Sequence, residues 1–264
     1  MNQPGSTQRI RHAVEVVPNA ASVATRGAEW LIEQIAHAVQ RRGRAAVALS
    51  GGSTPHAMYA HLAEHPWRDR IEWAKLHLFF GDERFVPHDD PASNARMADE
   101  TLIAHVPIPP GNVHRIACVG SPRSDASVTA TAAHSAREAA ANYQKTLADF
   151  YGGTALDEAR PLFDVVLLGL GIDGHTASLF PGTPALEERK AWAVAVATEN
   201  AIAPLRITLT YPVIESTHAV AFLVCGVQKR AIATRVLAGD ESLPAAHVHP
   251  QGGTLWIIDQ DAAG

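Results

Sequence analysis

The segment Phe163–Leu168 constrains the fold of this chain more than any other. Apart from Asp164, its residues are apolar, and β-branched valines stand at its centre. Such a short apolar run is typical of a strand covered on both faces, as the strands of a parallel sheet are. A segment with four glycines, residues 169–182, follows and interrupts the apolar run. The pattern therefore predicts a buried parallel strand with a turn at its carboxyl end.

Strand-like and helix-like segments alternate along most of the chain. Between the first two expected strands, apolar residues recur at helical spacing and Gly43 is placed to end that helix. This alternation is typical of βα units that build a mostly parallel sheet. We therefore expect an α/β fold, with helices on both faces of the sheet. The expected strands are 12–17, 45–49, 76–80, 163–168, 192–196, 206–210, 219–224 and 254–258.

The length of 264 residues fits one large α/β domain or two small ones. No linker of biased composition divides the chain, and we interpret residues 120–127 as a surface loop. We therefore expect a single domain over residues 1–264, with residues 1–10 as a flexible tail. Hydrophobic residues make up 47% and charged residues 19% of the chain, which is ordinary for a globular protein.

Charge and cysteine content exclude several classes of protein. The net charge is −5 and no basic run stands out, which argues against a nucleic-acid partner. No stretch approaches the roughly 18 apolar residues of a membrane span, and the polar N-terminus has no signal-peptide core. Cys118 and Cys225 are far apart, so neither a disulfide framework nor a thiolate metal site is expected. These features together predict a cytoplasmic protein.

Asp173 and His175 lie in the glycine-rich segment that follows the strand Phe163–Leu168. In open α/β sheets, ligands bind in the crevice beyond the carboxyl ends of the strands. Imidazole is the side chain whose ordinary titration lies nearest neutral pH, which suits a general base. We therefore expect His175 and Asp173 to point into that crevice as catalytic residues.

The residues Ser50, Gly51, Gly52, Ser53 and Thr54 stand between an expected strand and an expected helix. A strand, a glycine turn and a helix start can bind an anion, because backbone N–H groups approach it and the helix dipole favours it. The Gly-Lys-Ser/Thr ending of a Walker A loop is missing. An ordinary capped turn is the alternative interpretation. Arg206, at the start of a strand, and Lys229, after another, are candidate cations for this site, with surface charge as their alternative.

Charged residues also follow the expected strand 76–80. Asp82, Glu83 and Arg84 begin two residues after that strand, at the edge where the other strands end. We therefore place them in the same crevice. His247 and His249 would share one face of an extended strand, but no third ligand is near them, and we expect no metal site there.

Taken together, these segments resemble the 6-phosphogluconolactonase family, within a larger group that includes the glucosamine-6-phosphate deaminases. The resemblance covers most of the chain. The string that begins at Gly171 and ends at Pro181 carries it most specifically, followed by Gly81–Arg84. The other matching segments are 49–55, Ser93-Asn94, 112–116, and Arg206 with Lys229.

The resemblance implies the fold of the sugar-phosphate isomerases and deaminases, and hydrolysis of 6-phosphogluconolactone to 6-phosphogluconate without a cofactor or a metal. It implies that His175 activates the attacking water. Arg84 would then donate to the oxyanion, helped by backbone N–H groups of residues 169–174, or would clamp the substrate. Asp82 or Asp173 would orient Arg84, His175 or a sugar hydroxyl. The 6-phosphate would be held by residues 50–54 with Arg206 and Lys229.

Two alternatives remain at this level. A deaminase or isomerase of the group carries a glutamate five residues beyond the matching histidine, where this chain has Phe180, and Asp-Glu-Tyr in place of Asp82-Glu83-Arg84. A sugar-phosphate sensor would keep the pocket and lose the chemistry. The expected partner is a small phosphosugar lactone, with no nucleic acid and no membrane, and the protein is expected to be a monomer or a small homo-oligomer.

Overall fold

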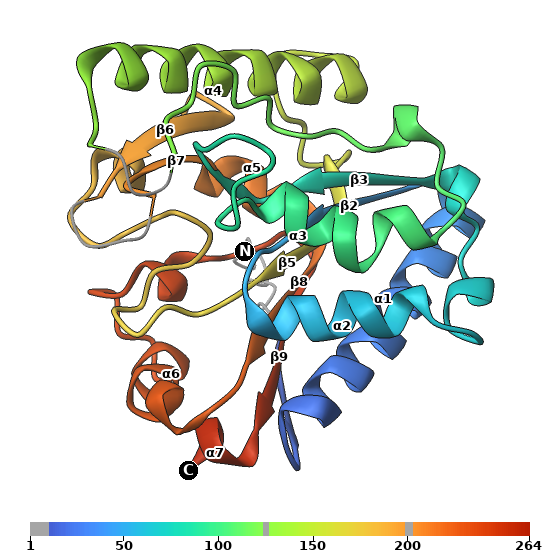
Figure 1. The fold of residues 1–264 in the computed structure, drawn as a ribbon. Coiled ribbons are helices and arrows are strands. Elements are labelled where there is room, and N and C mark those ends of the chain that lie inside the picture. Colours follow the sequence, from blue (N-terminus) through green and yellow to red (C-terminus); the bar gives the residue numbers. More distant parts are fainter. Residues whose placement is uncertain (1–10, 124–126, 199–202) are drawn as a thin grey trace, which may run out of the picture.

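A parallel sheet of six strands forms the centre of the computed structural model (Figure 1), which describes residues 11–123, 127–198 and 203–264. The expected tail, residues 1–10, and part of the loop 120–127 lie outside these ranges. Neighbouring strands all pair in parallel. Across the sheet the order is β1 (Arg11–Val17), β9 (Gly253–Asp259), β8 (Thr217–Val224), β5 (Phe163–Leu168), β2 (Ala45–Leu49) and β3 (Leu76–Phe80).

The strand order reverses between β2 and β5, which lie side by side. From β2 the next strand in the main sheet is β3, on one side, whereas from β5 it is β8, on the other. Such a switch point leaves a crevice beyond the carboxyl ends of the two strands, and ligands of open α/β sheets bind there. The loops that follow β2 and β5 are the two segments in which we expected the site.

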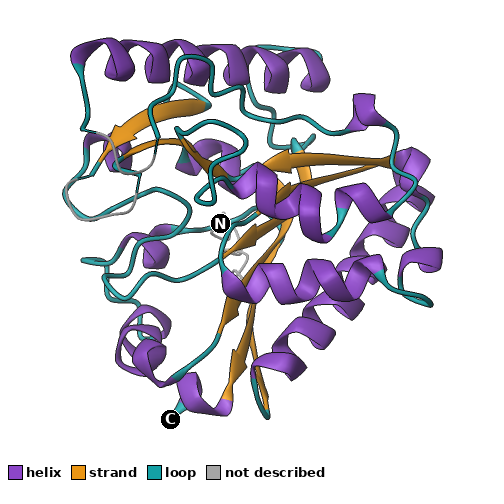
Figure 2. Cartoon of the chain, viewed as in Figure 1, coloured by secondary structure: helices purple, strands orange, loops and turns teal. Residues whose placement is uncertain are grey.

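Helices flank the sheet, as expected (Figure 2). Helix α1 (Ala20–Arg42) packs on β2, β5, β8 and β9, and it ends at Gly43, whose φ of 73° is left-handed. Helix α2 (Ser53–Ala63) packs against α1, and α3 (Asn94–Thr101) packs against α2. The remaining helices are α4 (Ala130–Tyr151), α5 (Tyr211–Glu215), α6 (Arg230–Leu237) and α7 (Gln260–Ala263).

A second, antiparallel sheet was not predicted. It consists of β4 (Asp82–Arg84), β7 (Leu205–Leu209) and β6 (Ala193–Ala197), and α4 covers it. We expected strands at 192–196 and 206–210 but did not separate them from the parallel sheet, and we expected no strand at β4. Three residues are too few to show strand periodicity, and β7 is buried along its whole length, as a parallel strand would be.

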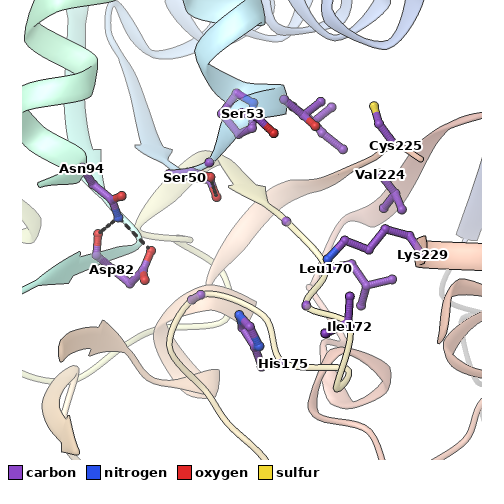
Figure 3. Close-up of a pocket in the computed structure, with 18 of the residues that line it drawn as sticks. Ser50, Ser53, Asp82, Asn94, Leu170, Ile172, His175, Val224, Cys225 and Lys229 are labelled. Carbon is purple, nitrogen blue, oxygen red and sulfur yellow. Dashed lines mark hydrogen bonds between the residues drawn. The ribbon is translucent and has the colours of Figure 1, made fainter. Parts of the chain in front are cut away.

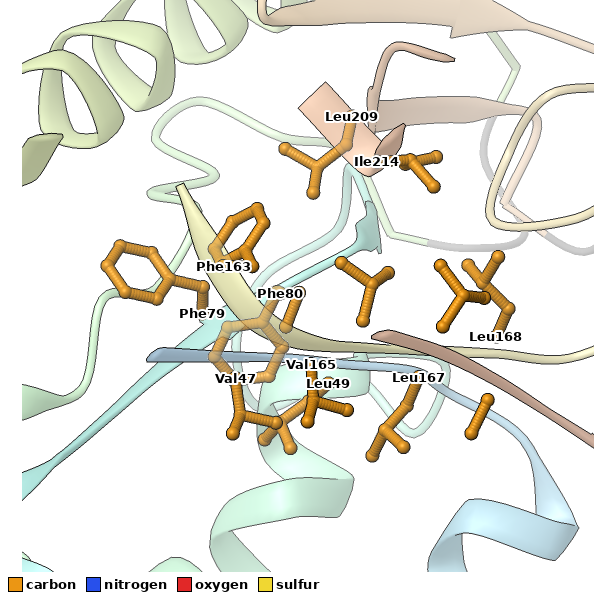
Figure 4. Packing of buried hydrophobic residues seen from close by; sticks show 14 of the residues in the cluster. Val47, Leu49, Phe79, Phe80, Phe163, Val165, Leu167, Leu168, Leu209 and Ile214 are labelled. Carbon is orange, nitrogen blue, oxygen red and sulfur yellow. The ribbon is translucent and has the colours of Figure 1, made fainter. Parts of the chain in front are cut away.

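The core lies on both sides of the parallel sheet. Figure 4 shows Leu209 and Ile214 packed over one side of the central strands, with Val47 and Leu167 on the other. Every residue of β2 and β5 is buried, as predicted for strands covered on both faces. Within the described ranges, no helix is long and apolar enough to cross a membrane.

Candidate active site

A cavity of about 450 Å³ opens at the carboxyl ends of β2 and β5 (Figure 3). Every catalytic or phosphate-binding residue predicted from the sequence lines it, apart from Asp173, which is hydrogen-bonded to one that does. Glu83, which we also placed in this crevice, does not line the cavity. The switch point thus brings together side chains from segments that are far apart in the sequence. Those that line the cavity are Ser50, Gly51, Gly52, Ser53, Thr54, Asp82, Arg84, His175, Arg206 and Lys229.

His175 and Asp173 form a hydrogen-bonded pair at the cavity. The distance between His175 Nδ1 and Asp173 Oδ1 is 2.5 Å. Burial raises the pKa of Asp173, but the charge and hydrogen bonds of His175 outweigh it and lower that pKa. Asp173 therefore stays a carboxylate and fixes the imidazole with Nδ1 toward itself. This leaves His175 Nε2 to exchange a proton with a ligand.

The turn that carries this pair depends on Gly171 and Gly174. The N–H of Gly171 donates to the carbonyl of His175 at 2.8 Å, and Gly174 has a φ of 83°. A Cβ atom at position 171 would lie 2.1 Å from His175 Nδ1 and 2.6 Å from Asp173 Oδ1. The imidazole therefore folds back over a backbone that only glycine leaves open. The N–H groups of Gly171 and Gly174 are both engaged within the turn, so neither is available to an oxyanion.

The start of α2 supplies anion-binding groups. The first N–H groups of a helix have no acceptor within it, and the capping residue Gly52, with a φ of 105°, makes no side-chain cap. The N–H of Ser50, in contrast, donates to the hydroxyl of Tyr59 at 3.0 Å. Ser50 therefore contributes its side chain and not its amide to the cavity.

Two arginines meet on the second sheet. Arg84 and Arg206 are directly paired across β4 and β7, so their side chains leave the same face of the sheet. Burial, and then the charge of Arg84, lowers the pKa of Arg206 to about 10. Arg84 Nη1 donates to the carbonyl of Ala92 at 2.7 Å, whereas its buried Nε has no hydrogen-bond partner within the described part of the chain. Two adjacent guanidinium groups and an unused donor suit an anionic ligand.

Lys229 enters the pocket from the opposite wall. In Figure 3 its side chain extends toward the loop at Leu170, while Asp82 and Asn94 lie across the pocket, with His175 between the two walls. Burial lowers the pKa of Lys229, and the charge of Asp173 acts in the other direction. The cavity is thus lined by Lys229 in addition to the two arginines.

Asp82 is held by residues that the sequence analysis did not single out for it. Its Oδ2 accepts a hydrogen bond from Ser178 Oγ at 2.6 Å, and Asn94 Nδ2 donates to its carbonyl oxygen at 3.0 Å. Asp82 makes no hydrogen bond to Arg84 or His175 among the residues that the structure describes, so it does not orient either of them by a direct bond. Of the expected roles, contact with a sugar hydroxyl remains.

Glu83, which we expected in the crevice beside Asp82 and Arg84, is instead buried and joins β4 to α3. Only 2% of its surface is exposed. Its carboxylate accepts hydrogen bonds from the N–H groups of Arg84, Asn94 and Ala95, each at 2.7 Å. Burial raises the pKa of Glu83 to about 7, although these hydrogen bonds act in the opposite direction. The one sequence signal was the Ser93-Asn94 helix start, to which this carboxylate binds.

The two histidines considered as a metal site, His247 and His249, do not line this cavity. His247 lies in a 3₁₀ turn, Pro244–His247, and not in an extended strand, and its Nε2 lies 2.6 Å from the carbonyl oxygen of Glu241. No group of three histidine, cysteine or acidic side chains that could hold a metal occurs in the described ranges. Cys118 and Cys225 are free thiols, and Cys225 lines the cavity.

The fold and the cavity define an α/β protein with a histidine–aspartate pair and three cationic side chains, those of Arg84, Arg206 and Lys229, at the switch point of its sheet. The chain belongs to the glucosamine-6-phosphate isomerase/6-phosphogluconolactonase family, whose profile matches residues 18–257. It is 35% identical to a 6-phosphogluconolactonase of Nostoc over 96% of this chain and 98% of that one, and 36% identical to one of Mycobacterium tuberculosis over 95% and 97%. The structure of 6-phosphogluconolactonase from Trypanosoma cruzi superposes with a TM-score of 0.83, at 30% identity and 98% coverage of both chains. The expected family and fold class are confirmed.

Proposed function

We propose that this chain hydrolyses 6-phosphogluconolactone to 6-phosphogluconate, the lactone-opening step of the oxidative pentose phosphate pathway. One observation carries the proposal: the His175–Asp173 pair opens into the same cavity as the start of α2, Arg206 and Lys229. A phosphorylated ester needs both a base and an anion site. The names of the relatives, 6-phosphogluconolactonase in each case reported, support the same activity.

In the proposed reaction, His175 Nε2 takes a proton from a water molecule as that water attacks the C1 carbonyl carbon of the lactone. Asp173 stabilises the imidazolium that forms, through the 2.5 Å contact to Nδ1. The tetrahedral oxyanion then collapses, the bond from C1 to the ring oxygen breaks, and the imidazolium returns the proton to that oxygen. The products are one carboxylic acid group and one hydroxyl group, with no cofactor or metal required.

The 6-phosphate is proposed to lie at the start of α2, between Arg206 and Lys229. Helix N–H donors, the Ser53 and Thr54 hydroxyls and two cations together offset the two negative charges of a phosphate monoester. Arg84 stands beside Arg206, which supports either of the two roles expected for it, donation to the oxyanion or clamping of the substrate, here through its phosphate. A comparison of Arg84→Ala on phosphorylated and unphosphorylated lactones separates the two. If activity falls on both lactones, Arg84 donates to the oxyanion. If activity falls on the phosphorylated lactone alone, Arg84 contacts the phosphate.

The structure gives the deaminase alternative no support at the position that distinguishes it. The side chain five residues beyond His175 is Phe180, which is buried and packs on the imidazole with ring centroids 4.3 Å apart. A phenyl ring cannot assist ring opening by proton transfer. We therefore favour the lactonase. We also propose that the protein is cytoplasmic and a monomer or small homo-oligomer.

The proposed function is tested by following the decay of freshly prepared 6-phosphogluconolactone at neutral pH, with and without the protein. We expect the protein to accelerate the decay far above the spontaneous rate. A protein that binds 6-phosphogluconate but leaves the decay rate unchanged would be a sensor. Release of ammonia from glucosamine 6-phosphate, without lactone hydrolysis, would identify a deaminase.

A further inference from the structure

A second cavity, of about 310 Å³, lies at the opposite edge of the parallel sheet from the candidate active site. Its lining includes Arg44, immediately before β2, and Asp164, at the start of β5. The same two strands carry the active-site loops at their other ends. Neither the sequence analysis nor the proposed function assigns a role to this cavity. The charged and aromatic residues around it are Arg42, Arg44, Phe150, Tyr151, Arg160 and Asp164.

Two of its arginines are held by aromatic rings. The guanidinium carbon of Arg44 lies 4.4 Å from the ring centre of Phe150, and that of Arg160 lies 4.0 Å from the ring centre of Tyr151. Both rings belong to the end of α4. A guanidinium that stacks on a ring keeps the N–H groups at its edge free for an acceptor, and the stacking restrains the side chain in advance. The rings therefore pre-organise two cationic groups at one cavity.

The charges in this cavity are unbalanced. Asp164 is 3% exposed, and its carboxylate already bonds Arg42 and, at 2.9 Å, the N–H of Ala46. Its negative charge is therefore offset by Arg42. Arg44 and Arg160 have no ion-pair partner among the residues described. On a chain of net charge −5, this leaves two uncompensated positive charges that share one cavity.

Helix capping accounts for only part of this arrangement. Arg160 Nη1 donates to the carbonyl of Tyr151 at 3.0 Å, which satisfies the end of α4. Within the described ranges the Arg44 side chain makes no hydrogen bond that would explain its position. Its charge acts on a neighbour, since burial, and then Arg44, lowers the pKa of His77. The N–H groups of Arg44 and the remaining ones of Arg160 are thus available to a ligand.

We propose that this cavity binds a phosphate group, as inorganic phosphate or as the phosphate of a small metabolite, at a site separate from the active site. The two guanidinium groups bind its oxygens as charge-assisted donors, while the apolar rings behind them keep the site rigid. Arg42 stays paired with Asp164 and takes no part in binding the phosphate.

The test isolates this site by weakening the proposed phosphate site of the active cavity. Inorganic phosphate is titrated by calorimetry into the Arg206→Ala protein and into the same protein with Arg44→Gln and Arg160→Gln, at constant ionic strength with chloride as the balancing anion. We expect the remaining phosphate affinity to fall at least tenfold with the two added substitutions. Arg41→Gln, which removes a nearby exposed arginine outside the cavity, should leave it unchanged. The same titration with 6-phosphogluconate shows whether the second cavity binds a phosphosugar in addition to inorganic phosphate.

An unchanged phosphate affinity in the triple variant would overturn the proposal, as would an equal loss in the Arg41→Gln control. Arg44→Gln alone guards against misfolding, because the Arg44 side chain makes no hydrogen bond to any residue that the structure describes. The phosphate affinity of this variant should also fall while its thermal unfolding stays that of the parent. Lactone hydrolysis by the Arg44→Gln, Arg160→Gln protein with Arg206 intact should match the wild-type protein when phosphate is absent. Unchanged hydrolysis together with lost phosphate binding would show that the second cavity acts independently of the proposed active site.

Discussion

At the scale of single residues, the candidate site depends on space as much as on charge. The imidazole of His175 lies where any side chain at position 171 would stand. Gly51 has a similar role, since a Cβ atom there would lie 2.0 Å from the Asn94 oxygen that faces it. Gly171 thus leaves room for the proposed base, and Gly51 leaves room for the amide that donates to Asp82.

Gly171→Ala should therefore damage catalysis without removing any reactive group. The new methyl group displaces the imidazole from Asp173, and a displacement of about 1 Å can lower a rate about 10²-fold. The comparison is kcat for 6-phosphogluconolactone in this variant and in Gly111→Ala, whose added methyl group meets nothing within 4 Å. Equal kcat values in the two variants would show that catalysis tolerates displacement of His175 from Asp173.

Arg206→Ala and Lys229→Ala should each raise KM for the phosphorylated lactone about 10- to 100-fold, because a charge-assisted hydrogen bond is worth roughly 1.5–3 kcal/mol. Unphosphorylated gluconolactone should be much less affected. Arg230→Ala serves as the control, since this exposed neighbour of Lys229 does not line the cavity. If both lactones lose affinity equally, the two cations are structural and the phosphate lies elsewhere.

At the scale of elements, the junction of β4 and α3 positions one wall of the site. Glu83 satisfies N–H groups of both elements, and the same junction places Asn94 against Asp82. Removing one acceptor leaves a buried N–H group unpaired, at a cost of about 1–3 kcal/mol. Glu83→Gln should lower the free energy of unfolding by that amount in a denaturant titration. Glu100→Gln, an exposed change on α3, should alter it by less than about 0.5 kcal/mol.

The pH dependence of stability should also report on Glu83. Its folded-state pKa of about 7 lies above the ordinary value of 4.5, so the folded protein binds this proton more tightly than the unfolded chain does. The contribution of Glu83 to the free energy of unfolding therefore falls as pH rises from about 4.5 to 7. Glu83→Gln, which cannot bind the proton, should show a flatter dependence over that range. An identical slope in both proteins would mean that Glu83 is ionised throughout.

The elements differ in how far the sequence predicts them. The apolar runs of β2, β3 and β5 have sharp ends, and their expected bounds agree with the structure. Since parallel strands end at one edge, the sequence also brought Asp82, His175 and the loop after β2 to one crevice. The pairing of Arg84 with Arg206 could not be predicted, because it depends on the register of two short antiparallel strands, β4 and β7, that lie far apart in the sequence.

At the scale of the whole molecule, the parallel sheet separates two cationic cavities. One lies at the switch point beyond β2 and β5, and the other lies where those strands begin. The first contains a histidine–aspartate pair and the second does not, so we expect catalysis only in the cavity beyond the carboxyl ends of β2 and β5. A domain extending over residues 1–264 remains our proposal.

A chelator should leave lactone hydrolysis unchanged. The proposed reaction uses an imidazole base, and the cavity has one histidine among hydroxyl, carboxylate and cationic groups, unlike the three-ligand set of a catalytic zinc. The measurement is the hydrolysis rate before and after prolonged incubation with EDTA. Inactivation that added zinc reverses would make His175 a metal ligand.

The most direct measurement compares wild-type protein with His175→Ala in the decay of freshly prepared 6-phosphogluconolactone at neutral pH. Both proteins are first checked for the same circular dichroism spectrum and thermal unfolding. We expect kcat to fall about 10²- to 10⁴-fold, the usual effect of removing a positioned general base, with little change in KM. A variant that hydrolyses the lactone as fast as the wild-type protein would contradict the role of His175 as the base.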